Sequence, residues 1–311
     1  MEFYSFLTLC LQMQLTRAGD ILVSNFNNAK NLQGTGSTIV KIDRTGKTSL
    51  FFQGHPGIGL TAALGLLNND VIIVGNLPTS DGTMATVQPG SLFLISDKGQ
   101  EIAELKDGNL IDGPWGLTIY EKDDKAHIFF SNVLNGTISR LDLRWTAAQH
   151  AYTLERLIRI SSGYTHRLDQ AALVLGPSGL AYDSSDDTLF IANSADNTIY
   201  AVTQAGATNS DRGIGHVIYQ DNAHLHGPLD LLLAPNGHFL VANSDGSNVD
   251  PNQPSEIVEF TRDGKFVAQI SVDPANGGAF GIALKATKGV VELAAVDDNA
   301  NVLKIWTELL P

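Results

Sequence analysis

Six times in this chain an apolar stretch runs, usually through one small residue, into an asparagine or an aspartate. These polar residues follow one another at intervals of 50 to 61 positions, and they are Asn25, Asn76, Asn132, Asn193, Asn243 and Asp297. Amide and carboxylate oxygens are the ligands that Ca²⁺ prefers. If a common axis brings the six strand ends together, we predict that they form one ring of oxygens that holds a metal ion.

Asp230 also occupies an unusual position in the sequence. It stands where the other aligned segments carry glycine, namely Gly59, Gly116, Gly179 and Gly281. A carboxylate in a crowded interior is costly unless it is paired or bound to a metal. We therefore predict that Asp230 is a metal ligand or a catalytic group. The structural alternatives are a carboxylate hydrogen-bonded to neighbouring amides and, for each asparagine alone, an Asx-turn that starts the next loop.

Three histidines precede glycine-containing segments of the same kind. His224 and His226 come just before Gly227-Pro228, and His55 comes before Pro56-Gly57. A histidine there could take a proton from a water that attacks an ester or lactone carbonyl, while a metal polarises that carbonyl. We predict catalytic roles for all three, together with Asp230. Alternatively, His224 and His226 bind zinc, a weaker idea because only two nitrogen ligands are visible, or the histidines simply face solvent.

The elements that position these residues are predicted from the repeat itself. A period near fifty residues, with several short strands and tight turns in each copy, is typical of a propeller blade. We predict an all-β, six-bladed propeller in a single domain, because all-β folds often reach 311 residues as one unit. Since an open sheet edge must be covered, an N-terminal strand should close the last blade. The expected blades are 8–53, 54–107, 108–160, 161–220, 221–271 and 272–311 plus 2–7.

Composition excludes several classes of partner. Lys and Arg number 20 against 33 Asp and Glu, a net charge of −13, which disfavours nucleic acid and anionic membranes. No apolar run is long enough to span a bilayer, so we expect no membrane insertion. Cys10 is the only cysteine, so disulfides do not indicate a compartment. The start of the chain is a poor secretory signal; a signal lost ahead of it would imply a periplasmic or secreted protein, and localisation stays open.

Two segments carry a family resemblance. Gly176-Pro177-Ser178-Gly179-Leu180-Ala181-Tyr182-Asp183 through Asn193, and Gly227 through Asn243 with the strand that follows, resemble the NHL repeat. The chain is also similar to the neighbouring six-bladed propellers of the senescence-marker/gluconolactonase and paraoxonase-like families. That resemblance implies a calcium-dependent lactonase, whose Asn, Asp and Glu oxygens surround an axial Ca²⁺. The chain departs from this pattern at its first inner strand, where Glu2 is the only nearby acid.

Together these features predict a monomeric, calcium-dependent hydrolase that opens a small-molecule lactone or ester. By analogy with the families, N-acyl homoserine lactones are candidate substrates, which would make the protein a quorum-quenching lactonase. Two alternatives stay open. The chain could be a non-catalytic NHL propeller that serves as a binding platform, or a metal-assisted lyase that resembles virginiamycin B lyase and releases products with a new double bond.

Overall fold

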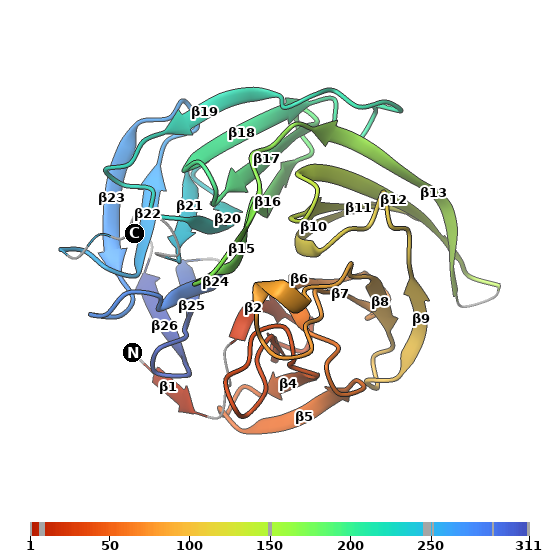
Figure 1. Ribbon diagram of the computed structural model, residues 1–311, viewed down its shortest axis with the longest axis horizontal. Helices are drawn as coiled ribbons and strands as arrows, with labels where there is room; N and C mark the ends of the chain where they lie inside the picture. The colour runs from red at the N-terminus through yellow and green to blue at the C-terminus, as the bar shows by residue number, and fades with distance from the viewer. Residues whose placement is uncertain are drawn as a thin grey trace.

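The computed structural model describes residues 2–5, 10–148, 151–244, 250, 252–287 and 289–309. Within these residues the strands form six four-stranded antiparallel sheets and one two-stranded sheet. The six sheets are arranged around a central axis as the blades of a propeller (Figure 1). The predicted fold class is therefore confirmed. No helix in the described part of the chain is long and apolar enough to cross a membrane.

In blades one to three the strands follow chain order from the axis outward. Blade one consists of β2 (Cys10–Leu15), β3 (Ile21–Asn25), β4 (Thr38–Ile42) and β5 (Thr48–Gln53). Blade two consists of β6 (Leu60–Leu66), β7 (Ile72–Asn76), β8 (Leu92–Ile95) and β9 (Glu101–Leu105), with the short 3₁₀ helix η1 (Met84–Thr86) in a loop. Blade three consists of β10 (Pro114–Lys122), β11 (Lys125–Asn132), β12 (Thr137–Thr146) and β13 (Ala151–Ser162).

Blades four to six follow the same plan. Blade four consists of β16 (Pro177–Asp183), β17 (Thr188–Asn193), β18 (Thr198–Thr203) and β19 (His216–Gln220). Blade five consists of β20 (Pro228–Leu233), β21 (Phe239–Asn243), β22 (Glu256–Phe260) and β23 (Phe266–Ser271). Blade six consists of β24 (Ala279–Thr287), β25 (Val290–Asp297), β26 (Val302–Leu309) and β1 (Glu2–Ser5).

The two ends of the chain meet in blade six. The N-terminal strand β1 pairs antiparallel with β26, with Glu2 opposite Ile305 and Ser5 opposite Val302. Figure 1 shows this closure, with β1 beside the last strands of the chain. This pairing covers the outer edge of β26 and joins the two ends of the chain in one blade, which closes the ring. The predicted closing strand is thus confirmed over Glu2–Ser5, and residues 6 and 7 of the prediction lie outside the described residues.

The inner strands approach one another closely at the axis. A Cβ atom on Gly179 would lie 2.5 Å from the Cα atom of Asp230 in the next blade, so only glycine fits at that point. At the other end of the blades, the turn before β21 contains Gly237 with φ of +82°, a conformation that glycine adopts without strain. Glycine therefore permits both the crowded axis and the tight turns.

Hydrophobic side chains fill the space between blades. Between blades four and five, for example, Phe190 and Phe239 lie with ring centroids 4.6 Å apart, and Phe260 extends the contact. The loop ahead of blade four contains an element that the repeat did not predict, the hairpin of β14 (Arg167–Asp169) and β15 (Leu173–Leu175). In Figure 1, β15 lies near the centre of the ring.

Candidate functional site

The six predicted ring residues end the second strand of their blades. Because all six sheets are built alike, β3, β7, β11, β17, β21 and β25 end at the same face of the propeller, which we call the asparagine face. All six side chains are buried, with at most 4% of their surface exposed. The structure therefore places Asn25, Asn76, Asn132, Asn193, Asn243 and Asp297 at equivalent positions of the six blades.

The side-chain amides are used within their own blades. In blades two to five the asparagine Nδ2 donates to a carbonyl in the loop ahead of the inner strand, over 2.7 to 3.1 Å. The accepting carbonyls are those of Ile58, Leu110, Thr165 and His224. Each amide thus ties its loop to the sheet, and these contacts do not direct the nitrogens to the axis.

The asparagine oxygens differ between blades. Asn76 Oδ1 accepts from both the backbone and the hydroxyl of Ser91. Asn132 Oδ1 accepts from the backbone of Asp112, and Asn193 Oδ1 accepts from the backbone of Ala195, each over 2.9 Å. Asn243 Oδ1 is buried and has no hydrogen-bond partner among the described residues. Blade five is therefore the exception.

The residue opposite the asparagine also sets blade five apart. In blades one to four that residue, on the third strand, carries a hydroxyl, and it is Thr38, Ser91, Thr137 or Thr198. In blade five the register Ala242↔Ile257, continued by one residue, places Glu256 there. Glu256 is completely buried. A carboxylate at this depth requires compensating positive charge or hydrogen-bond donors.

Glu256 belongs to a cluster of metal-ligating groups in blade five. His226, Asp250 and Glu256 each offer one ligand atom, and these atoms all lie within 4.8 Å of one another. His226 Nε2 is 3.9 Å from Asp250 Oδ2. The His226 and Glu256 side chains are buried, while Asp250 is partly exposed. Two carboxylates and one imidazole in this arrangement can hold a divalent metal ion.

The axis at the asparagine face is apolar. Phe26 of blade one meets Trp115 of blade three edge-on, with ring centroids 5.2 Å apart. Leu229 of blade five joins the same cluster, as do Leu173 and Val174 of the β14–β15 hairpin. All of these side chains are buried. We call this cluster the apolar plug. The asparagine amides form hydrogen bonds within their own blades, and the oxygen-lined channel stays a prediction.

Asp230 connects blade five to blade six. Its Oδ2 accepts a hydrogen bond of 2.8 Å from the backbone N–H of Ile282, and its Oδ1 accepts one of 2.9 Å from the backbone of Leu231. Elsewhere hydroxyl groups link neighbouring blades: the Thr61 hydroxyl of blade two donates to the Pro114 carbonyl of blade three over 2.6 Å. Equivalent links run from Ser24 to Thr61, from Ser131 to Ser178 and from Ser178 to Pro228. Asp230 is thus a carboxylate hydrogen-bonded to neighbouring backbone amides, which is the structural alternative named in the sequence analysis.

The other two predicted histidines are not members of the cluster. His55 is exposed, and its Nδ1 lies 3.3 Å from its neighbour's carbonyl oxygen. His224 Nδ1 is 2.7 Å from Asp221 Oδ2, and its ring stacks on Phe266 of β23. Burial acts to raise the pKa of the Asp221 carboxyl, but hydrogen bonds from Tyr219 and His224 outweigh it and lower that pKa. Asp221 is therefore an anion that orients the His224 ring.

Two adjacent acids in blade six have different environments. Asp297 Oδ2 lies 2.6 Å from Lys304 Nζ, which also donates to the Val272 carbonyl of blade five. Asp298 is 9% exposed, and its Oδ1 has no hydrogen-bond partner among the described residues. Burial raises the pKa of Asp298 to about 8, and the neighbouring Asp297 adds to the rise. Asp297 is thus paired with a lysine, and Asp298 is protonated at neutral pH.

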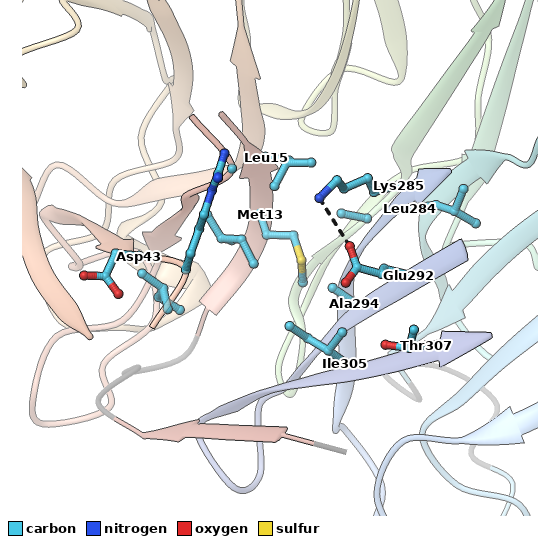
Figure 2. Close-up of a pocket in the computed structure, with 14 residues that line it drawn as sticks. Met13, Leu15, Asp43, Leu284, Lys285, Glu292, Ala294, Ile305 and Thr307 are labelled. Carbon is cyan, nitrogen blue, oxygen red and sulfur yellow. Dashed lines mark ion pairs between the residues drawn. The ribbon is translucent and has the colours of Figure 1, made fainter. Parts of the chain in front are cut away.

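A cavity of about 620 Å³ lies between blades one and six. Figure 2 shows Met13 and Leu15 on one side and Ala294 and Ile305 on the other. Lys285 and Glu292 form an ion pair of 3.3 Å in its lining. Polar and apolar side chains both line this cavity, and it contains none of the cluster residues.

Sequence reasoning selected His226 but missed the other two members of the cluster. Glu256 could have been found by aligning the third strands, since a glutamate there interrupts a series of serines and threonines. Asp250 lies in the long loop between β21 and β22, which the repeat does not align with any other blade. Its contribution could not be read from the spacing of residues.

Comparison with solved structures supports the fold. The chain is similar to a luciferin-regenerating enzyme, with a TM-score of 0.57 at 9% identity, covering 98% of this chain and 94% of the other. It is similar to a putative gluconolactonase, with a TM-score of 0.56 at 11% identity over 98% and 90%. It is also similar to a calcium-binding protein, regucalcin, from Agrobacterium tumefaciens, with a TM-score of 0.57 at 13% identity over 98% and 90%.

Comparison at the level of sequence adds no family. No family model matches the chain, and no curated protein matches it. The resemblance to the gluconolactonase and regucalcin structures is therefore shown for the fold, whereas the resemblance to the NHL repeat is not confirmed. At these low identities the likeness describes architecture and leaves the activity to be argued from the site.

Proposed function

We propose that the chain is a metal-dependent hydrolase that opens a small-molecule lactone or ester. The observation that supports this most is the convergence of His226, Asp250 and Glu256 in blade five. The predicted Ca²⁺ site on the axis does not fit the apolar plug around Phe26 and Trp115. The cluster in blade five does fit a divalent ion, because it combines buried carboxylate and imidazole ligands.

The chain's own residues would divide the work in blade five. His226, Asp250 and Glu256 would hold the ion, which when bound would polarise a substrate carbonyl. Of the predicted bases we propose His224, because Asp221 Oδ2 at 2.7 Å from Nδ1 fixes the ring and leaves Nε2 to accept a proton. Asp230 is assigned no catalytic step, since both of its oxygens accept backbone hydrogen bonds.

The substrate class and the identity of the metal ion are the more specific parts of this proposal. The regucalcin structure is described as that of a calcium-binding protein, so Ca²⁺ is one ion to add. Lactone substrates are suggested by the gluconolactonase likeness, and N-acyl homoserine lactones belong in the panel as cyclic esters. We propose a monomer, because the predicted site lies within one chain; size-exclusion chromatography with light scattering would test this.

The experiment measures hydrolysis by metal-stripped protein and by protein reloaded with Ca²⁺, Mn²⁺ or Zn²⁺. Lactones, N-acyl homoserine lactones and aryl esters are offered, and acid release is followed with a pH indicator. Glu256→Gln keeps the side-chain volume and removes the charge, so activity should fall on the order of 100-fold or more. Glu259→Gln, on the same strand but outside the cluster, should retain it. Equal rates with and without metal would refute the metal role.

A non-catalytic binding platform is the second candidate, and the apolar plug favours it. Phe26, Trp115 and Leu229 close the place where an axial site would lie. A platform would hydrolyse none of the panel in any metal state. A lyase would release the same carboxylic acid but would leave a new double bond in place of the hydroxyl, and the ultraviolet absorbance of that double bond would distinguish it from a hydrolase.

A further inference from the structure

We infer that blade five holds a four-ligand centre, with Asn243 Oδ1 as its fourth ligand, that selects a first-row transition ion such as Zn²⁺ or Mn²⁺ over Ca²⁺. This inference rests on the metal role given to His226, Asp250 and Glu256 in the proposed function. It is tested by binding, so it can fail or succeed independently of hydrolysis.

The first argument for a fourth ligand is the position of Asn243 beside Glu256. Continuing the register Ala242↔Ile257 by one residue places Asn243 directly opposite Glu256 on the neighbouring strand. Side chains at directly opposed positions of an antiparallel pair lie on the same face of the sheet. Asn243 Nδ2 donates over 2.7 Å to the carbonyl of His224, two residues before His226. The amide is thus fixed between two segments that supply ligands.

The second argument is the environment of the Asn243 amide oxygen. Asn243 has no exposed surface, and its Oδ1 has no hydrogen-bond partner among the described residues. At the equivalent positions, the oxygens of Asn76, Asn132 and Asn193 each accept a backbone hydrogen bond. A buried acceptor without a donor costs free energy that a bound cation can recover. Blade five therefore has a spare ligand where blades two to four have none.

The third argument concerns which metal ion the ligand atoms of this centre prefer. Ca²⁺ binds six to eight oxygens, whereas an imidazole nitrogen suits Zn²⁺ and other first-row transition ions. His226 supplies such a nitrogen at a buried position, beside one oxygen ligand each from Asp250 and Glu256. One nitrogen and three oxygens make a small mixed set of the kind that first-row divalent ions bind, and expansion to five ligands leaves a position for a substrate oxygen. It differs from the all-oxygen site that the sequence suggested.

Calorimetric titration of the metal-stripped full chain with Zn²⁺, Mn²⁺ and Ca²⁺ salts tests this directly. We expect one Zn²⁺ or Mn²⁺ per chain and Zn²⁺ affinity at least about 100-fold above that for Ca²⁺. Asn243→Ala should weaken Zn²⁺ binding about tenfold or more, and Asn193→Ala should leave it unchanged. His226→Asp, which replaces nitrogen by oxygen, should narrow the ratio of Zn²⁺ to Ca²⁺ affinity about tenfold or more.

Folding of each variant is checked by circular dichroism. If Asn243→Ala does not fold, Asn243→Asp keeps an oxygen in place and should bind Zn²⁺ at least as well as the parent chain. Ca²⁺ binding as tight as Zn²⁺ binding, no binding of any ion, or unchanged affinity in a folded Asn243→Ala variant would overturn the inference. Zn²⁺ binding without hydrolysis of any substrate would instead refute only the proposal that the protein is a hydrolase.

Discussion

The carboxylate of Asp230 accepts a hydrogen bond of 2.8 Å from the backbone N–H of Ile282, across the boundary between blades five and six. Thr61 makes the corresponding link from blade two to blade three with its hydroxyl. The charged residue that stands in place of glycine on the crowded axis is thus part of a series of contacts that join consecutive inner strands. Its location alone would have suggested a catalytic group.

Asp230→Ala should lower the free energy of unfolding by about 1–3 kcal/mol, because it leaves a buried backbone N–H without its acceptor. Asp230→Asn keeps an acceptor oxygen and should cost less. Chemical denaturation measures both, with Asp263→Asn on an exposed turn as the control. A stable Asp230→Ala protein that has lost all hydrolysis would show instead that the residue is catalytic.

Asn132→Ala should destabilise the protein by a similar amount, about 1–3 kcal/mol, while leaving metal content unchanged. The buried amide donates to Leu110 and Thr137 and accepts from Asp112, so the substitution breaks several hydrogen bonds at once. Thermal denaturation and elemental analysis of the same preparation give the two readouts. Loss of the ion from this variant would restore the asparagine ring as the metal site.

Asp298 should make stability depend on pH. Its pKa is about 8 in the folded protein against an ordinary 3.8, so the folded state retains a proton that the unfolded state loses between those values. The stability that this proton supplies is complete below about pH 4 and is lost as pH rises through 8. Asp298→Asn removes the ionisation. The variant should melt increasingly above the parent chain from pH 5 to pH 8.5, by about 2 °C or more at the upper end.

The comparison of melting temperatures is made by calorimetry across that range. Because Asn is nearly isosteric with protonated Asp, the two proteins should converge near pH 4. A constant difference at every pH would mean that Asp298 ionises in the folded state as it does in the unfolded state.

His224→Gln should lower kcat by about 100-fold while KM changes little, because a general base acts on the transition state. His55→Gln is the matched control, since His55 is exposed and outside blade five. Steady-state kinetics on the best lactone of the panel measures both. If the two variants behave alike, the Asp221–His224 pair has no catalytic role.

The blade plan was predictable because propeller geometry imposes one pattern six times. The recurrence of Asn25 through Asp297 marks equivalent strand ends, and the closing of blade six by β1 follows from the need to cover an edge. The directions of the side chains were not predictable in this way. Whether an asparagine faces the axis or its own loop depends on the contacts that are available, such as the Leu110 carbonyl for Asn132.

The site was predictable only in part for the same reason. His226 and Asn243 stood out by residue type and position, but Glu256 acquires its role from lying opposite Asn243. The hairpin residues Leu173 and Val174 plug the axis from a loop that belongs to no repeat. Contacts that exist in a single blade leave no periodic signal, so they must be read from the structure.

The most direct test of the central claim is the metal content of the chain purified without chelators and dialysed against trace divalent ions. We predict about one equivalent of a divalent metal per chain, and its loss when Glu256→Gln is combined with His226→Ala. Inductively coupled plasma mass spectrometry measures both proteins side by side. A parent chain that binds no metal, or a folded double variant that retains the same amount, would contradict the assignment of blade five as the functional centre.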